Sequence, residues 1–225
     1  MKTMIFTLSR DNYKSLRDLT SPNKIEYCKK HGYLFEERND DFHFQNLGFE
    51  KIYRILEILN QDKCDILYWC GTDTLITNYN IKITDLIDVE HDFFIATDAN
   101  NINADSFVIK NTTDAREFFL KIINSYPQYA HHCWAEQQVI IDLIAQNEHY
   151  KNITKILPQK MINCYDYNIY PDSNFSGAID KLRNKQDYYG NYGQWEQGDF
   201  LIHWPATNLE QRLNLTKKYI PLIIK

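Results

Sequence analysis

One turn in the sequence carries a carboxylate at a position where α/β proteins often bind ligands. The segment 69–76 begins as an apolar run, breaks at Gly71 and has Asp73 at the tip of the turn. Ligands of α/β sheets bind just beyond the carboxyl ends of the strands. A carboxylate there can hold Mg²⁺ or Mn²⁺, which take oxygen ligands and leave positions open for phosphate. A lone Asp in a turn is more often a turn-former or a helix cap, so Asp73 needs partners.

Two later segments contain such partners. His203 ends the apolar run 200–204, and a neutral imidazole is a suitable Mn²⁺ ligand. Glu136 and Gln137 open a helical segment whose apolar residues recur with helical spacing. Their side chains either project into a cleft or stay solvated, where Glu136 would complement the helix dipole. The sequence leaves both interpretations open.

Composition and charge exclude several classes of protein. Apolar residues make up 44% of the 225 residues, enough to bury a sizeable core. The net charge is −5 and no long run of Lys or Arg is present, so we expect no nucleic-acid partner. The five cysteines form no CxxC pair, which favours a reducing compartment over a disulfide framework. We expect a cytoplasmic protein with no membrane span, and the oligomeric state stays open.

The pattern of apolar runs predicts alternating strands and helices in one domain, residues 1–225, because no linker or repeat interrupts it. This alternation is typical of an α/β sheet that is parallel in its first half. Expected strands are 3–8, 33–35, 65–70, 92–97, 105–110, 161–165 and 200–204, and expected helices are 23–32, 49–59, 115–123, 134–145 and one running from 209 to 220.

The order of several short motifs resembles glycosyltransferase family 34, a galactosyl/mannosyltransferase group. From Lys24 to Trp204 the chain reads HGY, DILYW, DTLITN, INADSFVIKNT, WAEQQ and GDFLIHW in that order. The resemblance implies a GT-A (nucleotide-diphospho-sugar transferase) fold, with one Rossmann-like mixed sheet flanked by helices. It also implies a nucleotide-sugar donor, a Mn²⁺ or Mg²⁺ cofactor and retention of anomeric configuration.

The resemblance also assigns roles to matching positions. Asp73 matches the second acid of the family's DxD motif and His203 the later histidine, both as metal ligands. Glu136 and Gln137 match the acidic–Gln pair on the reacting face of the donor sugar. Asn103 stands where the family's Asn-Ala-Gly segment lies against the transferred sugar, and its amide can both donate to and accept from hydroxyls.

Weaker candidates for the donor site come from the ends of predicted strands. Thr7, Ser9 and Tyr13 follow or end the first strand and suit a base- and ribose-binding edge. Asp98 follows the strand expected at 92–97 and is a candidate for a sugar hydroxyl.

Three positions depart from the family pattern. Gly71 replaces the first acid of DxD, which leaves three alternatives. Another group substitutes as the ligand, with Asp98 the best candidate, or the metal binds only weakly until donor phosphate joins it, or the protein is inactive. Asp105 replaces a glycine beside the transferred sugar, where it narrows the acceptor side or adds a polar contact. The basic residue expected soon after the histidine is absent, and Arg212 is the nearest cation for phosphate.

The sequence therefore predicts a metal-dependent, retaining glycosyltransferase that moves a sugar from a UDP- or GDP-sugar to a hydroxyl of a glycan acceptor. Glu136 or Gln137 would stabilise the oxocarbenium-like centre. A nucleotide-sugar- or glycan-binding protein that has lost catalysis is the alternative, and Gly71 is its motivation. A nucleotidyltransferase would require a Gly-rich loop after the first strand, but the first thirty residues contain no glycine.

Overall fold

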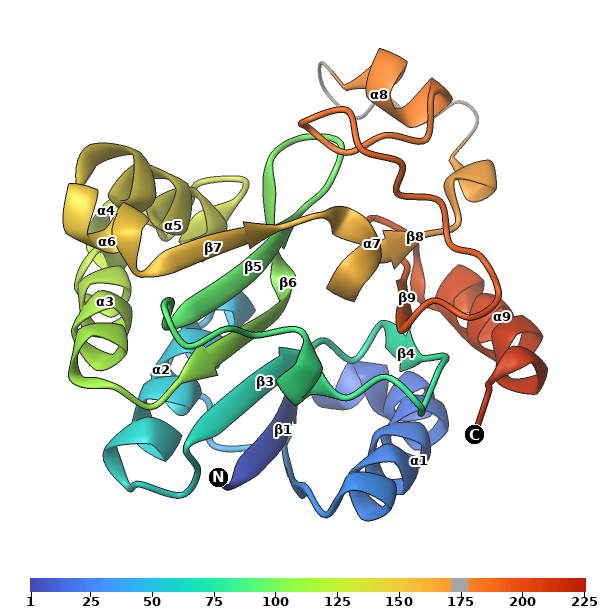
Figure 1. The fold of residues 1–225 in the computed structure, drawn as a ribbon, viewed down its shortest axis with the longest axis horizontal. Coiled ribbons are helices and arrows are strands. Elements are labelled where there is room, and N and C mark those ends of the chain that lie inside the picture. The colour runs from blue at the N-terminus through green and yellow to red at the C-terminus, as the bar shows by residue number, and fades with distance from the viewer. Residues whose placement is uncertain (171–177) are drawn as a thin grey trace.

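The computed structural model describes residues 1–170 and 178–225, and a six-stranded mixed sheet lies at its centre (Figure 1). The strand order is β2-β1-β3-β6-β5-β7, and a smaller sheet has the order β4-β9-β8. The strands of the large sheet are β1 Thr3–Leu8, β2 Leu34–Arg38, β3 Ile66–Cys70, β5 Phe93–Thr97, β6 Ile102–Lys110 and β7 Thr154–Leu157, and those of the small sheet are β4 Thr74–Ile76, β8 Cys164–Tyr165 and β9 Leu201–His203.

The direction of β6 decides which residues share an edge of the large sheet. Strand β1 runs parallel to both β2 and β3, which confirms the expected parallel first half. Strand β6 is antiparallel to β3, with Cys70 opposite Ser106, and also to β5. The residues that begin β6 therefore lie beside the residues that follow β3.

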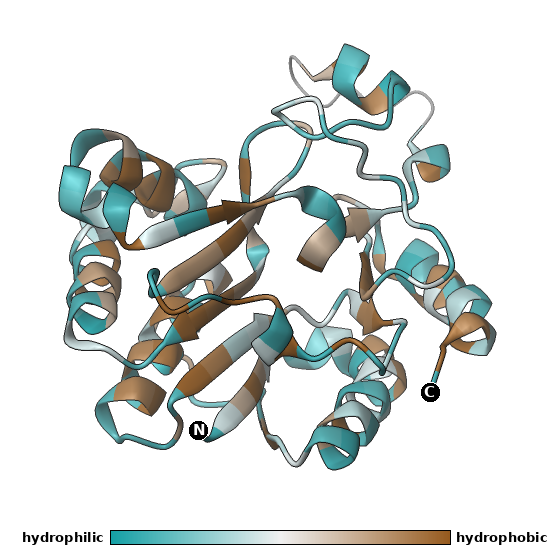
Figure 2. Ribbon diagram, viewed as in Figure 1, coloured by the Kyte–Doolittle hydropathy of each residue, from teal (hydrophilic) through white to brown (hydrophobic). Residues whose placement is uncertain are grey.

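Helices cover both faces of this sheet. Phe6 and Trp69 pack on one face, against α2, α3 and α5, whereas Ile5 and Tyr68 pack on the other, against α1 and α7. Figure 2 shows the strands as mainly hydrophobic and the outer turns of the helices as mainly hydrophilic. The helices are α1 Lys14–His31, α2 Leu47–Asn60, α3 Thr113–Asn124, α4 Tyr126–Tyr129, α5 Ala135–Gln146, α6 Glu148–Asn152, α7 Gln159–Ile162, α8 Ile179–Arg183 and α9 Leu209–Tyr219, with 3-10 turns at Asp11–Tyr13, Ile83–Asp85, Tyr167–Ile169 and Ile220–Leu222.

Two elements differ from their predicted form. Helix α1 begins at Lys14, nine residues earlier than the expected 23–32, and Pro22 lies inside it. Polar residues on its buried side hid the periodicity: the Asn23 side chain donates to the carbonyl of Ile76 and accepts from its N–H. The expected strand 161–165 was wrong in its first half, where α7 ends at Ile162 before the two-residue β8. Gly32 does end α1, with a left-handed φ of 68°.

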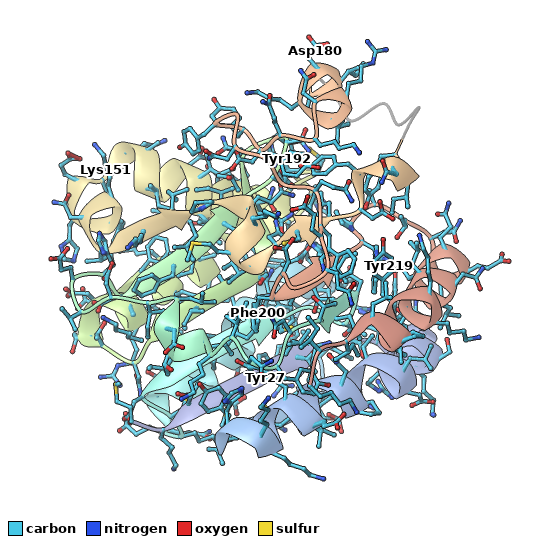
Figure 3. The ribbon with its side chains drawn as sticks, turned by 45° about the vertical axis from the view of Figure 1, so that its right-hand side comes forward. Tyr27, Lys151, Asp180, Tyr192, Phe200 and Tyr219 are labelled. Atoms are coloured by element: carbon cyan, nitrogen blue, oxygen red, sulfur yellow. The ribbon has the colours of Figure 1, made fainter. Side chains whose placement is uncertain are left out.

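The C-terminal segment folds back onto the N-terminal half of the chain. Helix α9 lies beside α1 (Figure 1). Figure 3 shows Phe200, just before β9, near Tyr27 of α1, and their ring centroids are 5.8 Å apart. Strand β9 pairs with β4, which places His203 opposite Thr74. This pairing positions the late residues of the chain next to the turn after β3.

Candidate active site

Two adjoining pockets open at the edge where β3 ends and β6 begins. The first, here the Asp73 pocket, is lined by Leu8, Ser9, Tyr13, Leu47, Trp69, Gly71, Thr72, Asp73, Asp105 and Arg212. The second, here the Glu136 pocket, is lined by Asn46, Leu47, Gly48, Lys51, Trp69, Asp105, Cys133, Trp134, Ala135, Glu136 and Gln137. Asp105 lines both pockets, so its carboxylate marks their boundary.

Asp73 occupies a strongly positive environment. Its backbone carbonyl accepts a hydrogen bond from the N–H of Trp204 at 3.2 Å, which ties the turn to β9. Its Oδ2 is 3.0 Å from the Arg212 guanidinium and 3.6 Å from Nε2 of His203. Burial acts to raise the pKa of Asp73, but the positive charges of His203 and Arg212 outweigh it and hold that pKa well below its usual range. Asp73 is therefore a carboxylate at neutral pH.

His203 presents one ring nitrogen to this carboxylate and is itself fully buried. Its Nδ1 is 2.8 Å from Oδ1 of Asn163, and the Asn163 amide nitrogen faces the carbonyl of Thr97 at 3.4 Å. A carbonyl only accepts, so Asn163 turns its oxygen to His203 and Nδ1 donates. Nε2 is left without a hydrogen-bond partner among the described residues.

Asp73 and His203 have the chemistry of a divalent-cation site. A hard carboxylate oxygen and an imidazole nitrogen suit Mn²⁺, and the open side of the pocket leaves positions for phosphate oxygens. The unpartnered Nε2 of His203 is the observation that fits such an ion. Within residues 1–170 and 178–225, however, no three His, Cys, Asp or Glu side chains already stand close enough to hold a metal ion. The ion would need further ligands.

An ion pair dominates the Glu136 pocket. Lys51 Nζ donates to Glu136 Oε1 at 2.7 Å and to the carbonyl of Ala104 at 2.6 Å. The side chains of Lys51 and Glu136 are 3% and 9% exposed, so solvent screens this pair little. Glu136 is thus not the solvated first-turn residue of the alternative interpretation.

Backbone features make room for Glu136. A Cβ at Gly48 would lie 1.6 Å from Glu136 Oε2, so any other residue there would force the Glu136 carboxylate to move. Ala135, directly before Glu136, has a φ of 41°, a left-handed conformation that costs energy outside glycine. The neighbouring Gln137 accepts a hydrogen bond from the N–H of Ala104 at 3.0 Å. Gln137 therefore reaches from α5 to β6, whereas Glu136 reaches from α5 to Lys51 on α2.

Three other predicted residues do not line either pocket. The Asn103 side chain donates to Asp98 at 3.1 Å and to the Tyr165 hydroxyl at 3.1 Å. Asp98 is buried, which raises its pKa, and its oxygens also accept from the N–H groups of Asn100 and Asn101. Thr7 is buried, with its hydroxyl 3.5 Å from that of Thr72. Direct sugar or nucleoside contacts of these residues stay predictions.

Ser9, Tyr13 and Arg212 lie together in the Asp73 pocket. The Arg212 guanidinium is 3.3 Å from the Tyr13 hydroxyl and lies over the Tyr13 ring, 5.6 Å from its centroid. The hydroxyl of Ser9 accepts from Arg17 at 3.2 Å. Arg212, held in place by Tyr13, is suited to a phosphate group, which it can bind with two parallel hydrogen bonds.

Sequence reasoning missed the residues that hold the site in place. Lys51 lies in the predicted helix 49–59 and Gly48 directly before it, where a lysine and a glycine carry no distinct signal. Asn163, the partner of His203, lay in a segment expected to be a strand. Lys24 is fully buried and donates to the carbonyl of Thr74 at 3.2 Å, beneath the Asp73 turn. Each depends on a partner far away in the sequence.

Known proteins resemble this chain along most of its length. A model of the galactosyl transferase GMA12/MNN10 family matches residues 4–92 and 87–213. An alpha-1,2-galactosyltransferase of Schizosaccharomyces pombe is 22% identical over 229 residues, covering 83% of this chain. This chain spans about half the length of that relative, because the match covers 55% of it.

Solved structures share the fold. A glycosyltransferase involved in the glycosylation of the major capsid of PBCV-1 superposes with a TM-score of 0.70 at 15% identity, over 97% of this chain and 100% of that chain. The galactosyltransferase LgtC, solved with donor and acceptor sugar analogues, gives a TM-score of 0.59 at 12% identity, over 96% of this chain and 95% of that chain. These likenesses confirm the predicted GT-A fold.

Proposed function

Because the chain belongs to the galactosyl transferase GMA12/MNN10 family, we propose that it is a glycosyltransferase. It moves a hexose from a nucleotide-sugar, a UDP- or GDP-sugar, to a hydroxyl of a glycan acceptor. The observation that carries the proposal is the adjacency of the two pockets, one lined by Asp73 and Arg212, the other by the ion-paired Glu136. His203 lies directly behind the first pocket, 3.6 Å from Asp73. A nucleotide-sugar donor requires a cationic group for its phosphates and, next to it, a carboxylate for its sugar.

The Asp73 pocket would bind the nucleoside diphosphate part of the donor. Ser9 and Tyr13 line it on the side of β1, where the base and ribose would lie. The buried Thr7 lies next to Thr72, which also lines this pocket. Arg212 is placed to meet the pyrophosphate and to stabilise its charge as the sugar departs. Asp73 and His203 would hold a Mn²⁺ or Mg²⁺ ion, which supplies Lewis-acid stabilisation to the leaving group when bound.

The Glu136 pocket would bind the transferred sugar and the acceptor. The carboxylate of Glu136 and the amide of Gln137 would face the anomeric carbon, and negative charge there stabilises an oxocarbenium-like centre. Lys51 holds the Glu136 carboxylate in one position. We further propose retention, in which the departing phosphate oxygen takes the acceptor proton and no separate base is needed. Asp105 lines both pockets, so it would lie close to the bond that is broken.

We propose that residues 1–225 form one catalytic domain, because α9 near the end of the chain contributes Arg212 to a pocket that residues of β1 and β3 also line. Among the described residues, no helix is both long and apolar enough to cross a bilayer. The partners are then a small nucleotide-sugar and a glycan acceptor.

A second candidate function is binding of a nucleotide-sugar or glycan without transfer. Two observations favour it: Gly71 removes an acid from the metal site, and Arg212 already pairs with Asp73 at 3.0 Å. Such a protein would bind the donor but neither hydrolyse nor transfer the sugar.

Thermal unfolding with candidate donors tests the proposal. UDP-glucose, UDP-galactose, GDP-mannose and GDP-fucose are each added with and without Mn²⁺. A donor at about 100 times its dissociation constant adds about 2.7 kcal/mol of stability. A shift for one nucleotide that requires Mn²⁺, together with turnover, supports a metal-dependent transferase. Binding without hydrolysis or transfer supports the second candidate, and no shift with any donor contradicts both.

Two substitutions test the metal ligands. Asp73→Ala or His203→Ala should abolish transfer while the circular dichroism spectrum of the folded protein stays unchanged. Full activity in either variant would contradict the metal assignment.

A further inference from the structure

We propose that Asp105 supplies the carboxylate that the chain lacks at Gly71, so that Asp73, His203 and Asp105 together bind the divalent cation. The inference rests on the proposed function, because it concerns the cation that accompanies the nucleotide-sugar. It replaces Asp98, the candidate favoured by the sequence, whose buried oxygens accept four hydrogen bonds from neighbouring protein groups.

Gly71 and Asp105 lie opposite each other where the chain after β3 runs beside β6. The antiparallel register of β3 and β6 places Cys70 opposite Ser106, and the N–H of Gly71 donates to the carbonyl of Asp105 at 3.1 Å. Side chains at directly opposite positions lie on the same face, with Cβ atoms about 4.5–5.5 Å apart. A carboxylate at position 105 therefore reaches the same space as a carboxylate at position 71.

His203 links the two carboxylates. Its Nε2 is 3.6 Å from Asp73 Oδ2 and 3.8 Å from Asp105 Oδ2. Because Nδ1 donates to Asn163, Nε2 is the ring nitrogen that faces both carboxylates. One imidazole nitrogen and two carboxylate oxygens form a donor set that suits Mn²⁺. No hydrogen-bond donor in the described part of the chain satisfies this buried nitrogen.

The spacing of these atoms suits an octahedral ion. With metal–ligand bonds of about 2.1 Å, neighbouring ligand atoms are about 3 Å apart and opposite ones about 4.2 Å. The distances of 3.6 and 3.8 Å lie between these values. The Asp105 side chain is 46% exposed, so it can rotate without disturbing the core.

The site is completed only when the ion binds with the nucleotide. The three side chains do not yet form a group close enough to hold an ion within the described residues. Two cations neutralise the carboxylates: Arg212 lies 3.0 Å from Asp73, and Lys51 lies 3.8 Å from Asp105. A diphosphate in the Asp73 pocket offers Arg212 a stronger partner and releases Asp73. Affinity for Mn²⁺ should therefore rise when a nucleoside diphosphate is bound.

The test measures Mn²⁺ binding rather than catalysis. Free Mn²⁺ is titrated by electron paramagnetic resonance against the whole protein with saturating UDP or, separately, GDP. Asp105→Asn should bind Mn²⁺ at least tenfold more weakly than the wild type, because losing even a residue that supports a ligand costs about 10–100-fold. Asp114→Asn is the matched control, since the Asp114 side chain is also 46% exposed but lies on α3. It should bind Mn²⁺ like the wild type.

A charge-relocation variant separates a metal ligand from a residue that contacts only the sugar. Asp105→Gly should bind Mn²⁺ weakly. The double variant Gly71→Asp, Asp105→Gly should bind Mn²⁺ at least tenfold more tightly than Asp105→Gly alone. A Cβ at position 71 would be 3.0 Å from the flexible Asp73 carboxylate and 3.3 Å from the carbonyl of Asp105, and melting curves verify that the double variant folds.

Two results would overturn the inference. Mn²⁺ affinity unchanged in both Asp105→Asn and Asp105→Gly would assign Asp105 to the sugar or acceptor, and it would leave the proposed glycosyl transfer intact. A wild-type protein that binds the nucleotide but no Mn²⁺ would remove the cation site altogether, and transfer activity measured in EDTA would then decide the proposed function separately.

Discussion

Replacing Gly48 by alanine tests whether the position of Glu136 matters for function. The added Cβ would lie 1.6 Å from Oε2, 2.1 Å from Cδ and 2.6 Å from Oε1 of Glu136. An ordinary contact to carbon is about 3.5 Å, so the carboxylate must retreat by about 2 Å. It then leaves Lys51, whose side chain is 3% exposed and loses its anionic partner.

The magnitudes follow from two opposing effects. Breaking a buried ion pair costs about 3–5 kcal/mol, whereas alanine in place of glycine within a helix gains about 1 kcal/mol. The free energy of unfolding should therefore fall by about 2–4 kcal/mol. A misplacement of about 1 Å can reduce catalysis about 100-fold, so kcat/KM for transfer should fall at least that much.

Steady-state kinetics with the donor found by thermal shift and urea unfolding measure the two effects. In a Glu136→Ala background the same Gly48→Ala change meets no carboxylate, so it should be neutral or stabilise the protein by up to about 1 kcal/mol. A Gly48→Ala variant with wild-type kcat/KM and higher stability would refute the placement of Glu136.

Two further predictions concern charge and thiol chemistry at the pockets. In EDTA, Asp73→Asn should be less stable than the wild type at pH 7, and this difference should shrink as the pH falls below the ordinary value of 3.8. A folded-state pKa depressed below the unfolded one gives stability above the unfolded pKa that is lost as the pH falls through the folded pKa. A difference that widens on acidification in urea-unfolding measurements would contradict the ion pairing. Ellman's reagent should label one thiol rapidly in the native protein, Cys133, because the other four cysteines are buried and burial raises the pKa values of Cys28 and Cys64 to about 12. Cys133 lines the Glu136 pocket, so a bound donor or acceptor should slow this labelling, and two rapidly labelled thiols would show that the core is open.

The sequence alone determined the elements whose signal is local. All six residues of β1 are buried, as its continuous apolar run predicted. The apolar spacing around Phe49 and Ile52 predicted α2, and Gly32 marked the end of α1. Hydrophobic periodicity and helix-stop residues act over a few positions, so one sequence is sufficient to detect them. The motif order was also enough to predict the family and the fold.

Only the tertiary structure decided which side chains meet. Asp73 acquired His203 and Arg212 as neighbours because β9 pairs with β4 and α9 follows it, and these partners are far away along the chain. The short strands β4 and β7 were missed, because strands of three or four residues have no detectable period and are fixed by their neighbours.

The same is true of the two features that carry the proposals. The pairing of Lys51 with Glu136 depends on how α2 and α5 pack, and the position of Asp105 opposite Gly71 depends on the register of an antiparallel pair. Neither the packing nor the register can be predicted from these residue types, because a lysine or an aspartate is equally compatible with a solvated surface. The sequence therefore supplied the chemical groups, and long-range strand pairing and helix packing decided which of them act together.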